Sequence, residues 1–372
     1  MASRSSALRL ATAALHRQNG WLRRNIQIEG ESIAALPASS GLRKTMETYN
    51  ARLLAAVGHN DEVLHTLFGA PPSFEWPWAA WQWPWATSDL NVETYNGLGS
   101  VWRHLAKDWS AEGHAGLQEL HAEIGSMVAT ELNGRAGGSV LLPGCGTARL
   151  AWELSNQLPD ALVIGTDTSA AQLAVARHML GCTQPGTLSI HPFLEESKNN
   201  ADDDARLTKL VVPDVAPGPP PANLVLALQP PSSLELLPGA GAVGDASTPG
   251  TDEPLLPRQV DVVVTCFFLD CLPDTLSAVR AIRDALAPGG VWVFAGPLEY
   301  HHWPGLVPTL SQLRELAHEE GLEPLGEPRF VSAPYLGKAG SLLHRQQYRA
   351  ALFACRRRKD GGWVSGQFDR TT

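Results

Sequence analysis

The sequence contains few cysteines, no long apolar run and no excess of basic residues. Its 372 residues include five cysteines without a CxxC pair, which argues against a disulfide framework and a structural zinc site. No run reaches about 18 apolar residues, so we predict no membrane span. Lys and Arg number 29 against 38 Asp and Glu, a net charge of -9, whereas a general nucleic-acid binder shows the opposite balance. We expect no metal centre, no nucleic-acid partner and no membrane association.

A hydrophobic fraction of 44% is sufficient for the core of one large or two ordinary domains. Apolar residues recur at helical spacing, as in Leu53, Leu54 and Val57, so we predict helices up to about residue 110. Residues 74–85 interleave five tryptophans with prolines, which forbids a continuous helix. We interpret this segment as a loop packed on the domain rather than a stacking platform for bases.

The first 28 residues hold five arginines and no acid before Glu29, a composition typical of transit peptides. The same residues also fit a basic amphipathic helix, with Leu8, Leu15 and Leu22 on one face. Sequence pattern alone leaves both interpretations open.

From Ser139 onward, strand and helix patterns alternate, which predicts a mainly parallel, doubly wound α/β sheet. Residues 216–258 are rich in proline and glycine, so we predict a mostly flexible surface insertion there. The predicted strands are 140–142, 161–166, 261–269, 291–295 and 347–355, and the predicted helices are 148–157, 170–180, 274–286 and 309–320.

Ligands in such sheets bind beyond the carboxyl ends of the strands. Gly144 and Gly146 follow the first strand, but Arg149 occupies the third position of a GxGxxG fingerprint, which disfavours nicotinamide or flavin binding. A ligand with a ribose and no pyrophosphate fits this turn, and S-adenosylmethionine has that profile. About 20 residues on, Asp167 ends the second strand, where it can bind ribose hydroxyls or, like Ser169, cap the next helix.

The stretch 261–271 predicts a buried strand that delivers Asp270 to the same edge of the sheet. A carboxylate there can hold or deprotonate an imidazole or an amine, and Asp274 is equally able to cap the following helix. His301 and His302 follow the next strand. At most one of two adjacent histidines faces a given pocket, and a solvated loop histidine is the alternative.

The chain resembles the carnosine N-methyltransferase family in the order and spacing of seven segments. These are 107–113, 142–153, 191–193, 197–200, 213–215, 265–270 and 296–301. The resemblance covers residues of about 100 to 302. It implies a class I methyltransferase fold, a Rossmann-like doubly wound sheet, with an added N-terminal helical region. We accordingly divide the chain into a helical region, 1–115, and an S-adenosylmethionine-binding domain, 116–372.

The resemblance implies S-adenosylmethionine as methyl donor and a small molecule, the imidazole of carnosine or a related histidine-containing dipeptide, as acceptor, giving anserine. We also expect a homodimer. Because the family's opening helix matches residues 8–37, the resemblance favours the cytosol, possibly with the nucleus, over organellar targeting. By position, the donor would contact His104, Lys107, Gly144, Gly146, Asp167, Asp245 and Cys266, and the acceptor would contact the catalytic residues Asp270, His301 and Tyr348.

Several residues depart from the family pattern. His104 and Lys107 stand where the family has Gln and Arg, and lysine loses the fork geometry of arginine. Ala148 replaces a third glycine, Asp167 replaces a glutamate, and Asp245 is the nearest candidate for an adenine contact. Two alternatives therefore remain, a methyltransferase of another imidazole, amine or peptide histidine, and a non-catalytic S-adenosylmethionine-binding interaction protein.

Overall fold

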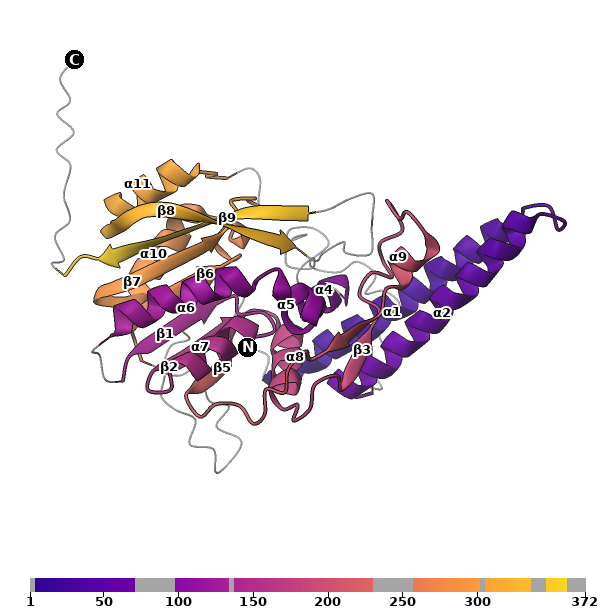
Figure 1. The fold of residues 1–372 in the computed structure, drawn as a ribbon, viewed down its shortest axis with the longest axis horizontal. Coiled ribbons are helices and arrows are strands. Elements are labelled where there is room, and N and C mark those ends of the chain that lie inside the picture. The colour runs from indigo at the N-terminus through magenta and orange to yellow at the C-terminus, as the bar shows by residue number, and fades with distance from the viewer. Residues whose placement is uncertain are drawn as a thin grey trace, which may run out of the picture.

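The structure is a computed structural model that describes residues 4–70, 98–133, 137–229, 257–301, 305–335 and 346–359. A seven-stranded sheet with helices on both faces forms the body, and two long helices extend from it (Figure 1). The strands of the sheet are β1 (Ser139–Pro143), β2 (Leu162–Asp167), β5 (Leu224–Leu228), β6 (Val260–Cys266), β7 (Leu286–Gly296), β8 (Leu322–Tyr335) and β9 (Gln346–Arg357). The helices are α1 (Arg4–Ala34), α2 (Gly41–Phe68), α4 (Leu98–Trp109), α5 (Ala111–Ala115), α6 (Gln118–Leu132), α7 (Arg149–Gln157), α8 (Ala170–Leu180), α9 (Asp203–Leu207), α10 (Thr275–Ala285) and α11 (Leu310–Glu319), with a 3₁₀ turn, η2 (Leu269–Cys271).

The strand order is β5-β2-β1-β6-β7-β9-β8. The first five strands are parallel, and β9 runs antiparallel to both of its neighbours. The predicted doubly wound sheet is thus confirmed. Insertion of antiparallel β9 between β7 and β8 distinguishes this order from the 3-2-1-4-5-6 order of dinucleotide-binding sheets.

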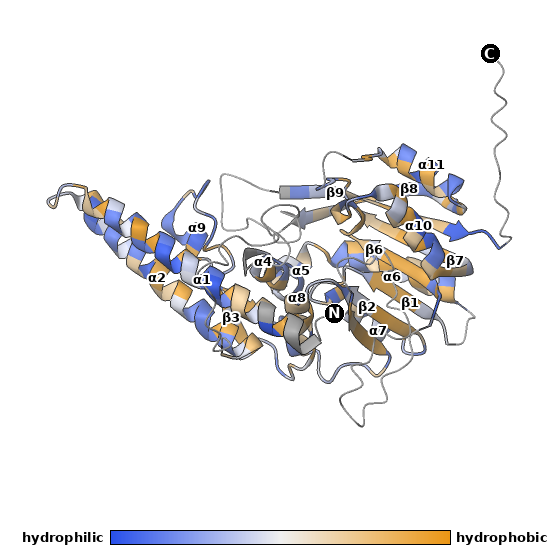
Figure 2. Ribbon diagram, turned by 180° about the vertical axis from the view of Figure 1, so that it is seen from behind, coloured by the Kyte–Doolittle hydropathy of each residue, from blue (hydrophilic) through white to orange (hydrophobic). Residues whose placement is uncertain are grey.

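Alternate residues of the central strands face two separate cores, as the two-residue period of a strand requires. On β1, Val140 and Leu142 belong to the core beneath α6, α7 and α8, whereas Leu141 belongs to the core beneath α10 and α11. Because both faces are covered, these strands are apolar along their length, and hydrophobic residues dominate them in Figure 2. Polar side chains can therefore meet beyond the carboxyl ends of these strands, where the helices no longer cover the sheet.

The long helices α1 and α2 pack against each other and close a smaller core. Leu22 and Ile26 of α1 meet Leu53 and Val57 of α2 there. Ser40 caps α2 by accepting a hydrogen bond from the Arg43 amide. The predicted N-terminal helices are confirmed over these spans. The tryptophan-rich segment 74–85 lies outside the described residues.

The secondary-structure prediction is wrong in several places. The insertion predicted at 216–258 contains strand β5, whose Leu-Val-Leu-Ala-Leu run pairs with β2 at the sheet edge; residues 230–256 lie outside the described part. The prediction omitted β8, an edge strand whose sequence carries prolines, which an edge tolerates. It also omitted a short hairpin, β3 (Leu188–Ile190) with β4 (Leu210–Val212).

The strand predicted over 261–269 ends earlier than expected. β6 stops at Cys266, and Phe267 has a φ of 51°, so the chain turns before it reaches Asp270. Asp270 itself lies in the 3₁₀ turn η2. The carboxylate therefore sits on a turn beyond the strand and not directly at its end.

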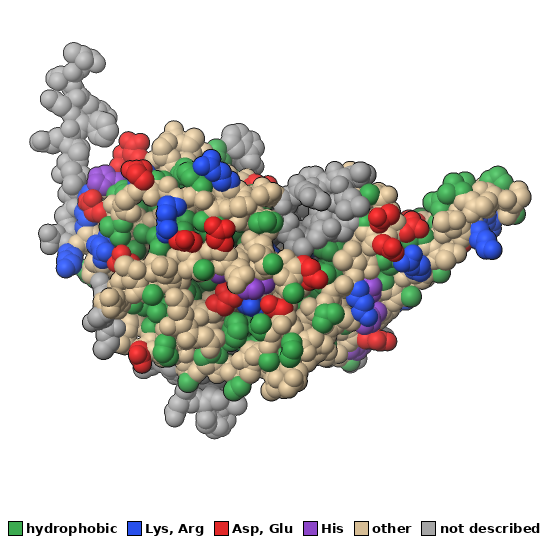
Figure 3. Space-filling view, viewed as in Figure 1, with side chains coloured by type: hydrophobic (Ala, Val, Ile, Leu, Met, Phe, Trp, Pro, Cys, Tyr) green, Lys and Arg blue, Asp and Glu red, His purple; other side chains and the backbone are tan. Residues whose placement is uncertain are grey.

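Acidic and basic side chains are interspersed over the face shown in Figure 3, and neither sign forms a continuous surface among the coloured residues. Among the helices that the structure describes, none combines the length and hydropathy that a bilayer crossing needs.

Candidate active site

The loop after β1 turns tightly on residues with positive φ. Gly144 and Gly146 have φ of 65° and 54°, and Ala148, before α7, has 63°. A side chain at Gly144 is excluded, because a Cβ there would lie 2.3 Å from Cδ2 of Phe268. A Cβ at Gly146 would meet nothing within 4 Å. The loop thus rests on the Phe268 ring and leaves its second glycine open to a ligand.

Asp167 ends β2 against this loop. Its Oδ2 accepts a hydrogen bond from the Gly146 amide at 2.8 Å, and its Oδ1 accepts one from the Ser169 amide at 2.8 Å. Burial raises the pKa of Asp167, although these amides oppose the shift. Since the two carboxylate oxygens together have four lone pairs, the group can still accept a hydroxyl. The side-chain cap of α8 is Ser169, which accepts from the Gln172 amide.

His104 on α4 reaches the start of α8. Its Nδ1 lies 2.6 Å from Nε2 of Gln172. Burial lowers the pKa of His104 to about 4, so the ring is neutral at pH 7, accepts at Nδ1 and carries its proton on Nε2. Oε1 of Gln172 is buried and has no hydrogen-bond partner among the described residues. It is an available acceptor for a hydroxyl or amino group at the start of α8.

Lys107 of α4 lies between Asp108 and the Phe267 ring, just past the end of β6. Its Nζ lies 3.0 Å from Oδ1 of Asp108 and 5.9 Å from the centre of the Phe267 ring. Burial raises the pKa of Asp108, but the Lys107 charge and a hydrogen bond from the Thr147 hydroxyl outweigh it, so the net shift is downward. Nearby, burial raises the pKa of the Cys266 thiol to about 12. The Cys266 thiol therefore stays protonated and uncharged at neutral pH and does not act as a nucleophile.

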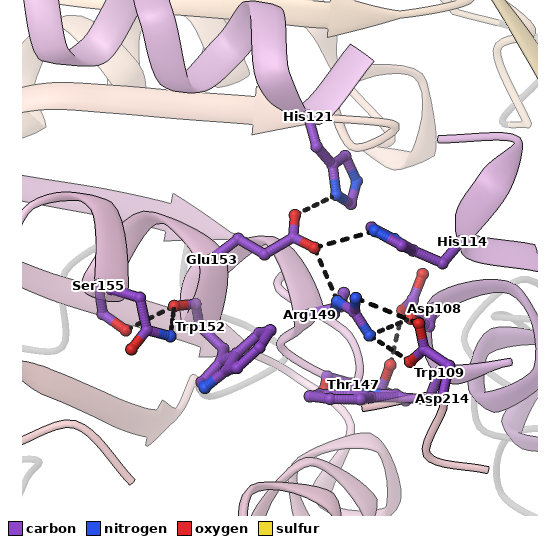
Figure 4. Close-up of polar contacts among 11 residues, drawn as sticks. Asp108, Trp109, His114, His121, Thr147, Arg149, Trp152, Glu153, Ser155 and Asp214 are labelled. Atoms are coloured by element: carbon purple, nitrogen blue, oxygen red, sulfur yellow. Dashed lines mark hydrogen bonds and ion pairs between the residues drawn. The ribbon is translucent and has the colours of Figure 1, made fainter. Parts of the chain in front are cut away.

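Arg149 joins three segments that are far apart in the sequence (Figure 4). Its Nε donates to Glu153 at 2.7 Å and its Nη1 to Asp214 at 2.6 Å. The guanidinium also lies 5.0 Å from the Trp109 ring, and the Trp109 indole donates to the Thr147 carbonyl at 3.0 Å. The third position of the glycine turn is thus occupied by a buried arginine that fixes the loop to α4 and to the segment after β4.

The three predicted catalytic residues meet around residues 299–301. Asp270 is 3% exposed, and its Oδ2 accepts a hydrogen bond from the Glu299 amide at 2.9 Å. Its carbonyl oxygen accepts from the His301 amide at 3.0 Å. The Tyr348 hydroxyl donates to Oε2 of Glu299 at 2.5 Å, and the Tyr348 ring lies 5.6 Å from the Phe267 ring. Burial raises the pKa of Asp270, and the Glu299 amide partly opposes this.

Sequence reasoning missed Glu299. The residue lies in the same segment after β7 as His301, and a second acid at an edge already holding Asp270 was the available signal. His302 and Asp245 lie outside the described residues. The roles assigned to the other residues remain predictions.

The two halves of the site are adjacent through the end of β6, since Phe267 faces Lys107 and Tyr348 while Phe268 supports Gly144. An open glycine turn, a carboxylate with free lone pairs and an orphaned buried amide oxygen fit S-adenosylmethionine. This fold and site define a class I S-adenosylmethionine-dependent methyltransferase.

Residues 87–359 match the family model described as carnosine N-methyltransferase, and the chain belongs to that family. It is therefore an S-adenosylmethionine-dependent N-methyltransferase. The carnosine N-methyltransferase of Schizosaccharomyces pombe is 26% identical over 289 residues, 73% of this chain and 73% of that protein. The Dictyostelium discoideum carnosine N-methyltransferase is 29% identical over 69% of this chain, and the match spans 53% of its length. Among solved structures, the N-methyltransferase NodS from Bradyrhizobium japonicum, in complex with S-adenosyl-L-homocysteine, is 13% identical with a TM-score of 0.36, over 65% of this chain and 87% of that one.

Proposed function

We propose that this enzyme methylates an imidazole nitrogen of carnosine or a related histidine-containing dipeptide, which gives anserine when carnosine is the acceptor. The observation that carries the proposal is the placement of Asp270. Its buried carboxylate has one oxygen fixed by the Glu299 amide. The residue lies just beyond the carboxyl end of β6, next to the loops expected to bind the donor. A carboxylate held in this way is suited to accept the N–H of a neutral imidazole.

The proposed role of Asp270 is to select the tautomer of the acceptor. A neutral imidazole has one N–H and one lone pair on opposite nitrogens, so binding the N–H to Asp270 leaves the other nitrogen as nucleophile. Once that nitrogen carries the methyl group, the N–H proton passes to the Asp270 carboxylate and from there to water, which leaves a neutral product. The Tyr348 ring lies 5.6 Å from the Phe267 ring, and its hydroxyl binds Glu299, the residue whose amide holds Asp270. S-adenosylmethionine supplies an electrophilic methyl group when bound. Since its leaving group needs no proton, positioning of the acceptor accounts for most of the catalysis.

Incubation of the purified protein with isotopically labelled S-adenosylmethionine and carnosine tests the proposal, with the methylated product identified by mass spectrometry and its position by NMR. We expect labelled anserine, and we expect Asp270→Asn to lower kcat/KM at least about 100-fold. Asp274→Asn is the matched control, because Asp274 only caps α10 and lies four residues away. It should keep wild-type turnover.

No product from carnosine, with donor binding retained by calorimetry, would reject carnosine as acceptor. Full turnover of Asp270→Asn would reject the role of this carboxylate. Methylation of histidine-containing peptides in place of the free dipeptide would redirect the assignment to a protein substrate.

We also propose that residues 1–28 are kept in the working enzyme, which then acts in the cytosol and the nucleus. The support is that Leu15, Leu22 and Ile26 of α1 are buried against the rest of the protein, so cleavage would expose two cores. Mass spectrometry of the N-terminal peptide from source cells tests this. Homodimer formation stays a prediction, which light scattering during gel filtration measures.

A further inference from the structure

Two histidines and a carboxylate meet between α1 and α2, away from the methyl-transfer site. His16 lies on α1, while Asp61 and His65 are four residues apart on one face of α2. One ligand atom from each of the three lies within 4.8 Å of the others. The two imidazole rings lie edge to face with their centres 4.8 Å apart.

Backbone carbonyls fix the tautomers of both rings. Nε2 of His16 lies 3.2 Å from the Gly69 carbonyl oxygen, and Nδ1 of His65 lies 2.8 Å from the Asp61 carbonyl oxygen. A carbonyl only accepts, so these nitrogens carry the protons, and in the neutral rings Nδ1 of His16 and Nε2 of His65 hold lone pairs. Metal-binding histidines are commonly oriented in this way through their second nitrogen.

The resulting geometry brings two acceptors face to face. Nδ1 of His16 lies 3.6 Å from Oδ1 of Asp61, which is too long for a hydrogen bond from a protonated ring. The same carboxylate oxygen accepts from Nδ2 of Asn19 at 3.1 Å, so its orientation is fixed as well. A cation bound to both atoms would offset the repulsion between this lone pair and the carboxylate.

A second cluster of two histidines and a carboxylate already has a positive charge beside its carboxylate. Glu153 lies 2.7 Å from His121 and 3.3 Å from His114, but the guanidinium of Arg149 is 2.7 Å from the same carboxylate. The arginine already supplies the positive charge there and would repel a metal ion. The cluster of His16, Asp61 and His65 is therefore the better candidate.

We propose that His16, Asp61 and His65 bind a divalent transition-metal ion, with Zn²⁺ as the best match to two imidazoles and one carboxylate. Zinc–ligand distances of about 2.0–2.1 Å place tetrahedral ligands about 3.4 Å apart, so the side chains close in by small rotations. Water completes the coordination, since His65 is exposed. The ion clamps α1 to α2 near the end of α2.

The test uses the full chain without a polyhistidine tag, stripped with EDTA and titrated with Zn²⁺ in a calorimeter, and with Co²⁺ as a spectroscopic probe. We expect one equivalent to bind and the Co²⁺ spectrum to show a tetrahedral site. His65→Ala should weaken binding at least 10-fold, and because this side chain is exposed the fold should persist. Asp61→Asn is a second variant that keeps the shape of the side chain.

His318→Ala is the matched control. His318 is another exposed histidine with a carboxylate 3.6 Å from its Nδ1, that of Glu323, but it has no second imidazole beside it in the described structure. This variant should bind Zn²⁺ like the wild type. Zn²⁺ should also raise the unfolding midpoint of the wild type and of His318→Ala but not of His65→Ala. Absence of Zn²⁺ binding to the wild type, or binding by His65→Ala and Asp61→Asn as tight as that of the wild type, would overturn the proposal.

Discussion

Arg149 binds Asp214 through two hydrogen bonds, with Nη1 2.6 Å from Oδ1 and Nη2 3.4 Å from Oδ2. The arginine side chain is 4% exposed and that of the aspartate 10%, so both charges are largely removed from water. The pair fixes the first turn of α7 to the segment after β4. Removing one partner leaves an uncompensated charge in the interior.

We therefore expect Arg149→Met to lower the free energy of unfolding by about 3–5 kcal/mol. Denaturant unfolding followed by circular dichroism measures the change. Arg52→Ala serves as the control, because Arg52 pairs with Asp204 at 2.6 Å where the two side chains are 50% and 82% exposed. Such a surface pair contributes about 0–1 kcal/mol. Equal losses in the two variants would contradict the role of the buried pair.

The two glycines of the β1 loop predict a graded effect. Gly144→Ala places a methyl group against the Phe268 ring and strains a backbone with φ of 65°, whereas Gly146→Ala adds only the backbone strain. A left-handed backbone costs an alanine about 1–2 kcal/mol. We expect Gly146→Ala to lose about that much stability and Gly144→Ala to lose more. Both variants should lose at least about 10-fold in donor affinity, Gly146→Ala because its methyl group enters the space left open to the donor.

Calorimetry with S-adenosyl-L-homocysteine and thermal unfolding measure both quantities for each variant. If Gly144→Ala bound the ligand as tightly as the wild type, the loop would not form the donor site in the proposed manner.

The sequence predicted the parts of this fold that depend on local pattern. The apolar runs at 139–143 and 260–266, and the caps at Ser169 and Asp274, determine their elements through burial and side-chain hydrogen bonds that a single stretch of sequence reveals. Strand β8 could not be predicted in the same way. Its prolines are tolerated because the strand lies at the sheet edge, and edge position is a tertiary property.

The candidate site shows the same division. Glycines after a strand and an acid about 20 residues on can be recognised locally. The contact between Tyr348 and Glu299 joins β9 to the loop after β7, and no spacing in the sequence indicates that two side chains 49 residues apart meet. Similarly, the position of Asp270 on a turn follows from the left-handed Phe267, a non-glycine residue for which that conformation is uncommon.

Glu299 predicts a preference for acceptors that carry a positive charge. Its exposed carboxylate is oriented by the Tyr348 hydroxyl and can bind the amino group of a dipeptide whose imidazole lies at Asp270. Glu299→Gln should raise KM for carnosine about 3–10-fold with little change in kcat, because an exposed charge pair is weak. Steady-state kinetics measure both constants.

N-acetylcarnosine provides the decisive comparison, since it lacks the charged amino group. The wild type and Glu299→Gln should use it with the same KM. Glu327→Gln, which changes an exposed glutamate on β8 paired with Arg314, should not affect either acceptor. Equal effects of Glu299→Gln on the two acceptors would exclude recognition of the amino group.

The raised pKa of Asp270 predicts the acidic side of the pH profile. Burial raises this pKa, and the proposed role needs the carboxylate form, so activity should fall as the pH decreases through the raised value. The acceptor imidazole, with an ordinary pKa of about 6.5, must also be neutral, and its protonation lowers activity in the same direction. His104 adds no further step above pH 5, because its pKa is about 4. Log kcat/KM should therefore decline more steeply with decreasing pH in the wild type than in Asp270→Asn, because the residual activity of the variant depends only on the acceptor imidazole. Equal slopes in the two proteins would show that Asp270 does not act as a carboxylate.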